Sequence, residues 1–215
     1  PDVPPMKRLH PLSCAGLSAP VTRFAMAALC GAASPLAYGA VIVDLDATSL
    51  PTGPLNPWTN RGTLGGTFVP GSTTAVPAVT TLDTVKGVQF DGNTHFYTGP
   101  AAPESVTGPN SRTVEAWIFN PTAAGEETIF SWGRRGGADG SNASFNHGTD
   151  LSFGAVGHWG APDIGWDGKL TTGRWTYVVY TYDSATQTTT VYSDGEVANT
   201  EVLDTPLATH SVDTT

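Results

Sequence analysis

The chain has 215 residues, of which 39% are hydrophobic and 9% aromatic, enough for the packed core of one domain. Only 13% of the residues are charged, about half the usual share, which excludes a coiled coil or a long helix stabilised by ion pairs. The net charge of −9 excludes a surface suited to nucleic acid or to anionic membranes.

The first 39 residues have the pattern of upstream read-through followed by a signal peptide. A methionine and two basic residues at 6–8 resemble a translation start, so residues 1–5 are expected to be read-through. The apolar run at 24–33 has the length of a signal-peptide core and is too short to span a bilayer. Small residues before Ala40 predict cleavage there; the alternative is an amphipathic helix that is retained.

Both cysteines, Cys14 and Cys30, lie in this predicted leader. The predicted mature domain, residues 40–215, therefore has no disulfide, no thiol chemistry and no cysteine metal site. An exported domain of this kind is held by its core alone or by bound ions. We expect it to be secreted or displayed at the cell surface, with no membrane insertion once the leader is removed.

After residue 40 the chain contains short runs rich in Val, Thr, Phe, Tyr and Trp, each bounded by Gly, Pro, Asn or Asp. This pattern is typical of strands, and no helical periodicity accompanies it. The predicted strands span residues 41–45, 67–69, 87–91, 113–120, 128–132, 151–155, 174–183, 188–193 and 196–202. Turns at 184–187 and at Asp194 and Gly195 join the last three strands as hairpins. The fold class expected for residues 40–215 is all-β, a two-sheet antiparallel jelly-roll sandwich.

The strand at 113–120 carries apolar residues on both of its faces. A strand that is apolar on both faces is expected to lie centrally, between two layers. We accordingly expect Trp117, Trp132 and Trp175 in the core.

Five runs of sequence are informative together: VIVDLDA at 41–47, VQFDG at 88–92, TVEAWI at 113–118, GRWTYV at 173–178 and TVYSDG at 190–195. In this order and spacing they resemble a laminin-G-like domain of the concanavalin A-like lectin/glucanase superfamily. The resemblance covers most of residues 41–200. It implies a two-sheet jelly roll, export, and binding of glycans or glycosylated proteins, with calcium in some members.

The end of the chain departs from that family pattern. In the family a late strand closes the sandwich beside the first strand, whereas nothing after Thr200 has such a pattern and residues 210–215 are polar. Either the chain is a fragment, incomplete at its C-terminus, or the sandwich closes differently. A fragment would leave an exposed sheet edge.

Residues 131–166 alternate aromatic, cationic and imidazole groups with glycine, which lets a ligand approach the backbone closely. Indole rings stack on the apolar faces of sugars, and the polar groups hydrogen-bond to hydroxyls. The candidate ligand-binding residues are Arg134, Arg135, Asn146, His147, His158, Trp159, Asp163 and Trp166. The adjacent arginines can also grip a carboxylate, so an acidic sugar fits. The alternatives are core positions for the tryptophans, and pairing of Arg134 with Asp163 or Glu127.

Catalysis requires a different signature. Glycosidases use two carboxylates, which glucanases of this fold carry in a Glu-x-Asp-x-x-Glu pattern along one strand. The comparable strand here offers Glu115 alone, with Thr113 and Trp117 on the same face. The adjacent Glu126 and Glu127 are expected in a loop. No histidine spacing for a metal, no nucleophile elbow and no phosphate-binding loop is present. The sequence therefore favours a protein without catalytic activity.

Calcium is the ion that fits, because it takes oxygen ligands in exported acidic domains. The loop at 139–142 is rich in oxygen atoms, and we expect Asp139 and Asn142 to contribute. Asp91 and Asp194 each precede glycine and are expected to be turn residues.

Three functions are compatible with the sequence. The first is an exported, non-catalytic binding module whose partner is a glycan or glycoprotein. The second is a glycan hydrolase or lyase on the same fold. The third is a structural or adhesive domain, part of a larger surface protein.

Overall fold

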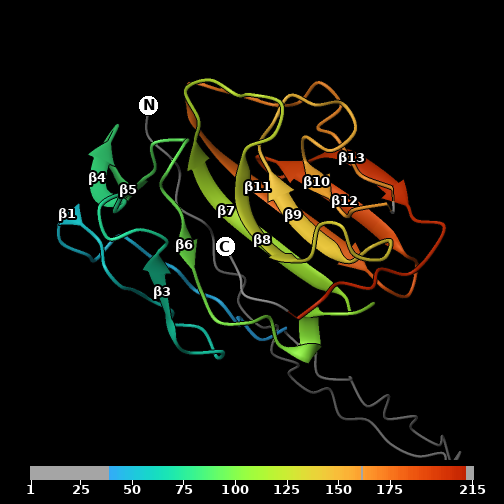
Figure 1. Cartoon of the computed structure of the whole chain (residues 1–215). Helices are drawn as coiled ribbons and strands as arrows, with labels where there is room; N and C mark the ends of the chain where they lie inside the picture. Colours follow the sequence, from blue (N-terminus) through green and yellow to red (C-terminus); the bar gives the residue numbers. More distant parts are fainter. Residues whose placement is uncertain (1–38, 161, 212–215) are drawn as a thin grey trace, which may run out of the picture. The chain divides into compact units, whose positions relative to one another are not determined.

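Antiparallel strands dominate residues 39–160 and 162–211, the residues that the computed structural model describes (Figure 1). The strands are β1 (Gly53–Pro54), β2 (Trp58–Thr59), β3 (Thr67–Pro70), β4 (Ala78–Leu82), β5 (Val85–Gln89), β6 (Tyr97–Thr98), β7 (Arg112–Phe119), β8 (Thr128–Gly133), β9 (Asn142–Asn146), β10 (Val156–Gly157), β11 (Trp175–Asp183), β12 (Thr188–Ser193) and β13 (Glu196–Val202). A short 3₁₀ helix, η1, spans Glu104–Val106. The all-β prediction is confirmed. The predicted leader up to residue 38 lies outside the described residues.

The strands form four antiparallel sheets, in the orders β1-β4-β5, β2-β3-β6, β10-β9-β8 and β13-β12-β11-β7. The last two sheets pack face to face, and Figure 1 shows β8 and β9 beside the long strands β7 and β11. Their shared core contains Phe145 of β9, Val156 of β10 and Val191 of β12. The predicted two-sheet sandwich is therefore present.

Strict alternation along β11 explains how its sheet faces the core. Val178, Tyr180 and Tyr182 are buried, whereas Trp175 and Tyr177 point to the opposite face. Successive strand residues point to opposite sides, so a pattern of period two buries one side of the sheet. We call the side away from β8 and β9 the outer face of the sheet.

The hairpins at the end of the chain follow the predicted bounds closely. β12 and β13 match the predicted strands residue for residue. Between them Asp194 and Gly195 have φ values of 51° and 85°. Left-handed backbone at both central positions gives the turn whose twist matches that of the flanking strands.

Two predicted strands are wrong. Residues 41–45 form no strand; their backbone instead bonds to the turn at 60–65, as in the contact from Thr63 N to Val41 O of 2.9 Å. Residues 151–155 form a turn that covers β9, held by the bond from Asn146 Nδ2 to Phe153 O. In this turn Ala155 packs in the core, whereas Leu151 is exposed.

The prediction that the strand at 113–120 lies between two layers is also wrong. The outer face of β7 is open, and Trp117 on it is 66% exposed rather than buried in the core. Trp132 is in the core as predicted, at 6% exposure. Trp175 is half-buried on the outer face, where its Nε1 donates to Leu82 O at the tip of the β4–β5 hairpin.

The segment after β13 closes the sandwich without forming a strand. Leu203 and Leu207 are buried in the core, and Thr209 forms an isolated bridge with Gly108. Ala208 N also donates to Gly140 O, in the loop between β8 and β9. These residues therefore pack against the sandwich as an irregular segment rather than as a strand.

Candidate functional site

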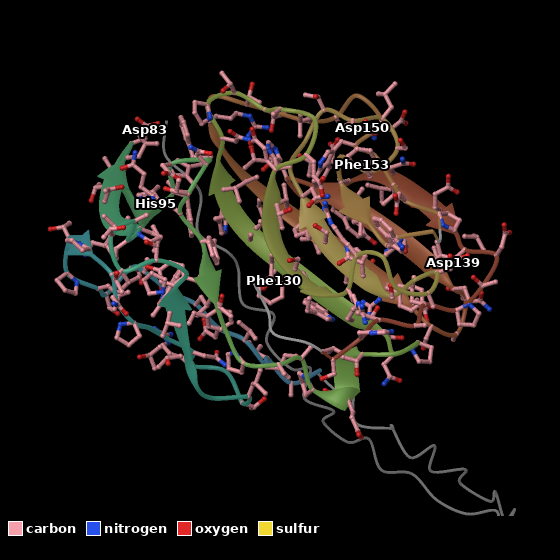
Figure 2. The ribbon with its side chains drawn as sticks, viewed as in Figure 1. Asp83, His95, Phe130, Asp139, Asp150 and Phe153 are labelled. Atoms are coloured by element: carbon pink, nitrogen blue, oxygen red, sulfur yellow. The ribbon has the colours of Figure 1, made fainter. Side chains whose placement is uncertain are left out.

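The predicted ligand-binding residues lie in the sheet β10-β9-β8 and in the loops that precede and follow β9 and β10. Figure 2 labels Asp139 in the β8–β9 loop, and Asp150 and Phe153 in the β9–β10 loop. Because β9 lies between these loops, they mark opposite ends of the sheet. Residues 158–163 return to the Asp139 end, where Gly140 N donates to Trp159 O.

Four of the predicted residues are buried inside the sandwich: Asn146, His147, His158 and Trp166. Each has a partner within the protein. Trp166 Nε1 donates to Gly154 O at 3.0 Å, and Asn146 accepts hydrogen bonds from the hydroxyls of Thr128 and Ser144. His147 Nδ1 faces the side-chain amide of Asn120 at 3.3 Å. These contacts give the four side chains a role in holding the fold, and they leave no face open to a ligand.

His158 is the most enclosed of them, with 0% exposure. Its Nδ1 lies 2.8 Å from Pro162 O, so Nδ1 carries the proton and Nε2 accepts from the Tyr180 hydroxyl at 3.2 Å. The oxygen of that hydroxyl in turn accepts from Arg112 Nε at 3.3 Å. Burial, opposed by the Pro162 bond and helped by the Arg112 charge, lowers the pKa of His158 to about 4. The side chain is thus a neutral structural group.

Arg112 sits in this interior without a carboxylate partner among the described residues. Its Nη1 donates to Val106 O, and its guanidinium lies 5.9 Å from the Trp132 ring and 5.2 Å from the Tyr182 ring. Aromatic faces attract a cation through their quadrupole. The two rings therefore replace a counter-ion for the buried charge.

Of the two predicted tryptophans, the fold buries Trp166 and presents Trp159 to solvent. Its side chain is 44% exposed. Its backbone φ is +67°, a left-handed conformation that is unfavourable for a bulky residue. Hydrogen bonds hold it there: Asp163 Oδ1 accepts from His158 N at 2.6 Å, and Asn142 N donates to His158 O. Such strained positions persist only when their surroundings fix them, and they cluster at functional sites.

Arg134, Arg135 and Asp163 accompany Trp159 at this end, and we call the four residues the Trp159 surface. Arg134 is exposed and forms no ion pair within the described ranges, so neither predicted internal pairing is present. Arg135 pairs instead with Glu126, in the loop before β8. Burial raises the pKa of Asp163, against the lowering by backbone bonds and the Arg135 charge.

The predicted calcium ligands are only partly arranged for a metal. Asn142 is buried and donates its amide to Gly157 O at 2.9 Å, whereas Asp139 is exposed beside Gly160. Among the described residues no group of three or more acidic, histidine or cysteine side chains is placed to hold an ion. Calcium binding stays a prediction, tested by the melting temperature with calcium and with a chelator.

A surface that sequence reasoning missed lies on the outer face of β7 and β11. Trp117 and Tyr177 are directly paired across the strands, with ring centroids 5.3 Å apart and planes tilted by 36°. The Tyr177 hydroxyl donates to the Glu115 carboxylate, which helps to raise the pKa of Tyr177 to about 12. The missed signal was Thr113 and Glu115, polar residues that share the face of Trp117.

Catalysis by two carboxylates has no basis on the outer face of β7. The side chains there are Thr113, Glu115, Trp117 and Phe119. Glu115 is the sole carboxylate among them, and it is bound by Tyr177. Glycoside hydrolysis requires an acid and a base or nucleophile on either side of one bond.

Comparison with known proteins adds the family. Residues 90–214, more than half of the chain, match the family described as the concanavalin A-like lectin/glucanases superfamily, through a laminin G-like model. A search of curated proteins and a search of solved structures found no match. Domains of this kind suggest a binding module and are commonly extracellular; within the described residues, no helix has the length and apolarity to cross a membrane. The match and the sandwich agree, and the chain belongs to the concanavalin A-like lectin/glucanase superfamily.

Proposed function

We propose that the domain is an exported, non-catalytic binding module for carbohydrate or glycosylated surfaces. The observation that carries the proposal is Trp159, an exposed indole held in a left-handed conformation by its neighbours. A fixed aromatic ring stacks on a sugar with little loss of conformational entropy. The domain family and the absence of a carboxylate pair on β7 support binding without turnover.

Polar groups around Trp159 supply the directional part of recognition. The guanidinium of Arg134 is exposed and offers a fork of donors to hydroxyls or to a sugar carboxylate. The half-buried Asp163 accepts hydrogen bonds beside the indole. A sugar ring stacked on Trp159 would therefore have donors and acceptors at its edge.

The setting we propose is the cell surface or the extracellular space, with the domain as part of a larger surface protein. The leader-like sequence before Ala40 supports export. A structural or adhesive role for the sandwich is the second candidate. The exposed surfaces of Trp159 and Trp117 favour binding, because a mere spacer has no need for exposed tryptophans.

A glycan array probed with the full chain, with calcium and with chelator, tests the proposal. The matched variants are Trp159→Ala and Leu151→Ala, which removes a side chain 87% exposed at the opposite end of the sheet. We expect Trp159→Ala to lose binding to the glycans that the wild-type chain binds through this surface, and Leu151→Ala to keep that binding. Turnover of a polysaccharide in a preparation freed of host enzymes, or no glycan bound by the wild-type chain, would contradict the proposal.

A further inference from the structure

We propose that the outer face of β7 and β11 is a second binding surface, separate from the Trp159 surface, which takes a neutral polysaccharide chain. Trp117 and Tyr177 form its centre. The Trp159 surface is built from loops of the other core sheet, so the two surfaces lie on different elements.

The central ring, that of Trp117, is exposed although packing of the fold does not require an apolar side chain there. Trp117 is 66% exposed, although the strand around it buries Val114, Ala116 and Ile118 against the core. Most large apolar residues that fold the chain are covered, so an exposed tryptophan in the middle of a strand marks a contact surface. The backbone ladder between β7 and β11 holds Trp117 opposite Tyr177, and the two rings pack against each other.

The aromatic surface continues along the strands. Phe119 and Trp175 are the next pair, with centroids 5.9 Å apart, and they follow Trp117 and Tyr177 on the same face. The tip of the β4–β5 hairpin, with the exposed Leu82, reaches Trp175 and bounds the aromatic surface there. Rings in two successive pairs suit a chain of sugars better than one sugar.

Hydrogen-bonding groups continue the face on the other side of the rings. Glu115 and Val179 form the next pair, and beyond it threonines stand in register across all four strands. They are Thr113, Thr181, Thr190 and Thr200. Sugars combine an apolar ring face with hydroxyl edges, and this surface offers rings beside carboxylate and hydroxyl oxygens.

The charges of the face select a neutral ligand. Glu115 lies next to the rings and repels a carboxylate or sulfate. Arg174 is paired with Asp194, which also accepts from Tyr177 N at 3.0 Å. Among the described residues of these strands, the outer face carries no cation that compensates Glu115, because Arg112 is buried on the core side. A neutral glycan meets none of this repulsion, whereas an acidic one does.

Affinity electrophoresis of the full chain tests the proposal, in native gels containing barley β-glucan, xylan or polygalacturonate. Trp117→Ala is the test variant, Leu151→Ala is the matched control, and Trp159→Ala reports on the Trp159 surface. Because Trp117 is exposed, the variant should fold, and near-ultraviolet circular dichroism checks that it does. We expect retardation by at least one neutral polysaccharide, weakened about tenfold or more in Trp117→Ala and kept in Leu151→Ala, since each tenfold step is 1.4 kcal/mol.

The other outcomes overturn the proposal in distinguishable ways. Loss in Trp159→Ala with no change in Trp117→Ala assigns neutral glycans to the Trp159 surface and leaves the proposed function standing. Retardation by polygalacturonate alone contradicts a neutral ligand and also leaves carbohydrate binding intact. No retardation in any gel overturns the outer-face site. A dimer in sedimentation velocity that Trp117→Ala abolishes assigns the outer face to a second copy of the chain.

Discussion

The Tyr180 hydroxyl donates to His158 Nε2 across 3.2 Å in the interior of the sandwich. The same hydroxyl accepts from Arg112 Nε, and His158 Nδ1 donates to Pro162 O. Each hydrogen bond in this chain therefore has a fixed donor and acceptor, in order from the buried guanidinium to the loop that carries Trp159. The arrangement works only while His158 is neutral, because a proton on Nε2 would face the hydroxyl proton.

Stability should therefore fall in mild acid. The pKa of His158 is about 4 in the folded chain, against an ordinary value near 6.5, because burial disfavours its charged form. Between these values the unfolded chain binds more protons, so the free energy of unfolding decreases as the pH falls from 6.5 to 4. The stabilisation is complete above pH 6.5, and about 3 kcal/mol is lost by pH 4. Urea unfolding across this range measures the slope.

The variant His158→Gln isolates this contribution. Burial also lowers the pKa of His147 and so adds to the slope, whereas the raised pKa of Asp163 acts in the opposite sense. Both remain in the variant, so the difference in slope belongs to His158, whatever the absolute stability of His158→Gln. Parallel slopes for the wild-type chain and the variant would show that His158 does not couple folding to protons.

Removing the shared hydroxyl should be costly. Tyr180→Phe removes the partner of both Arg112 Nε and His158 Nε2 in the interior. Buried polar groups without partners destabilise a fold, and we expect a loss of about 2 kcal/mol. Tyr192→Phe, on the outer face, is the control and should change stability by less than about 0.5 kcal/mol. Equal melting temperatures for the two variants would contradict the bonding scheme.

Two glycines should differ for a steric reason. A Cβ at Gly148 would lie 2.2 Å from Gly125 O, so Gly148→Ala forces two backbone segments apart and should cost about 3 kcal/mol. Gly168 has φ of +73° and open space, so Gly168→Ala meets only backbone strain of about 1 kcal/mol. Chemical denaturation ranks the pair. A larger loss for Gly168→Ala would mean that the loops do not approach as described.

The hydrogen bond on the outer face is visible by titration. Glu115 accepts from the Tyr177 hydroxyl, and this bond is the main reason that the pKa of Tyr177 rises to about 12. Glu115→Gln removes the negative charge, so the pKa of Tyr177 should move back towards 10. Nuclear magnetic resonance of labelled tyrosines measures it, with Tyr97 as an internal reference because burial alone raises its pKa. An unchanged pKa of Tyr177 would contradict the hydrogen bond between Tyr177 and Glu115.

Trp159 offers a test of backbone strain. Its φ of +67° is unfavourable for any side chain and free for glycine. Trp159→Gly should therefore be more stable than Trp159→Ala by about 1 kcal/mol, although both lose the indole. Thermal melts of the two variants compare them directly. If alanine is the more stable replacement, the left-handed conformation is absent in solution.

Local chemistry made the end of the chain predictable. β11 alternates strictly, and the Asp194–Gly195 turn specifies a tight hairpin between β12 and β13, so neighbours in sequence determine the pairing. β9 was missed because it contains Asn142, Ser144 and Asn146, polar residues that no pattern marks as buried. Later segments of the chain supply their partners: Asn146 donates to the Phe153 carbonyl in the turn at 151–155, and Asn142 donates to the Gly157 carbonyl of β10.

The sequence by itself determined an all-β sandwich and which side chains share a face, because both follow from a period of two and from turn residues. Only the tertiary structure decided which face is covered. Trp117 was expected inside and is exposed, whereas His158 and Trp166 were expected at a ligand and are buried. Alternation divides a strand into two sides, but burial depends on packing against distant segments, here the second sheet and the β4–β5 hairpin.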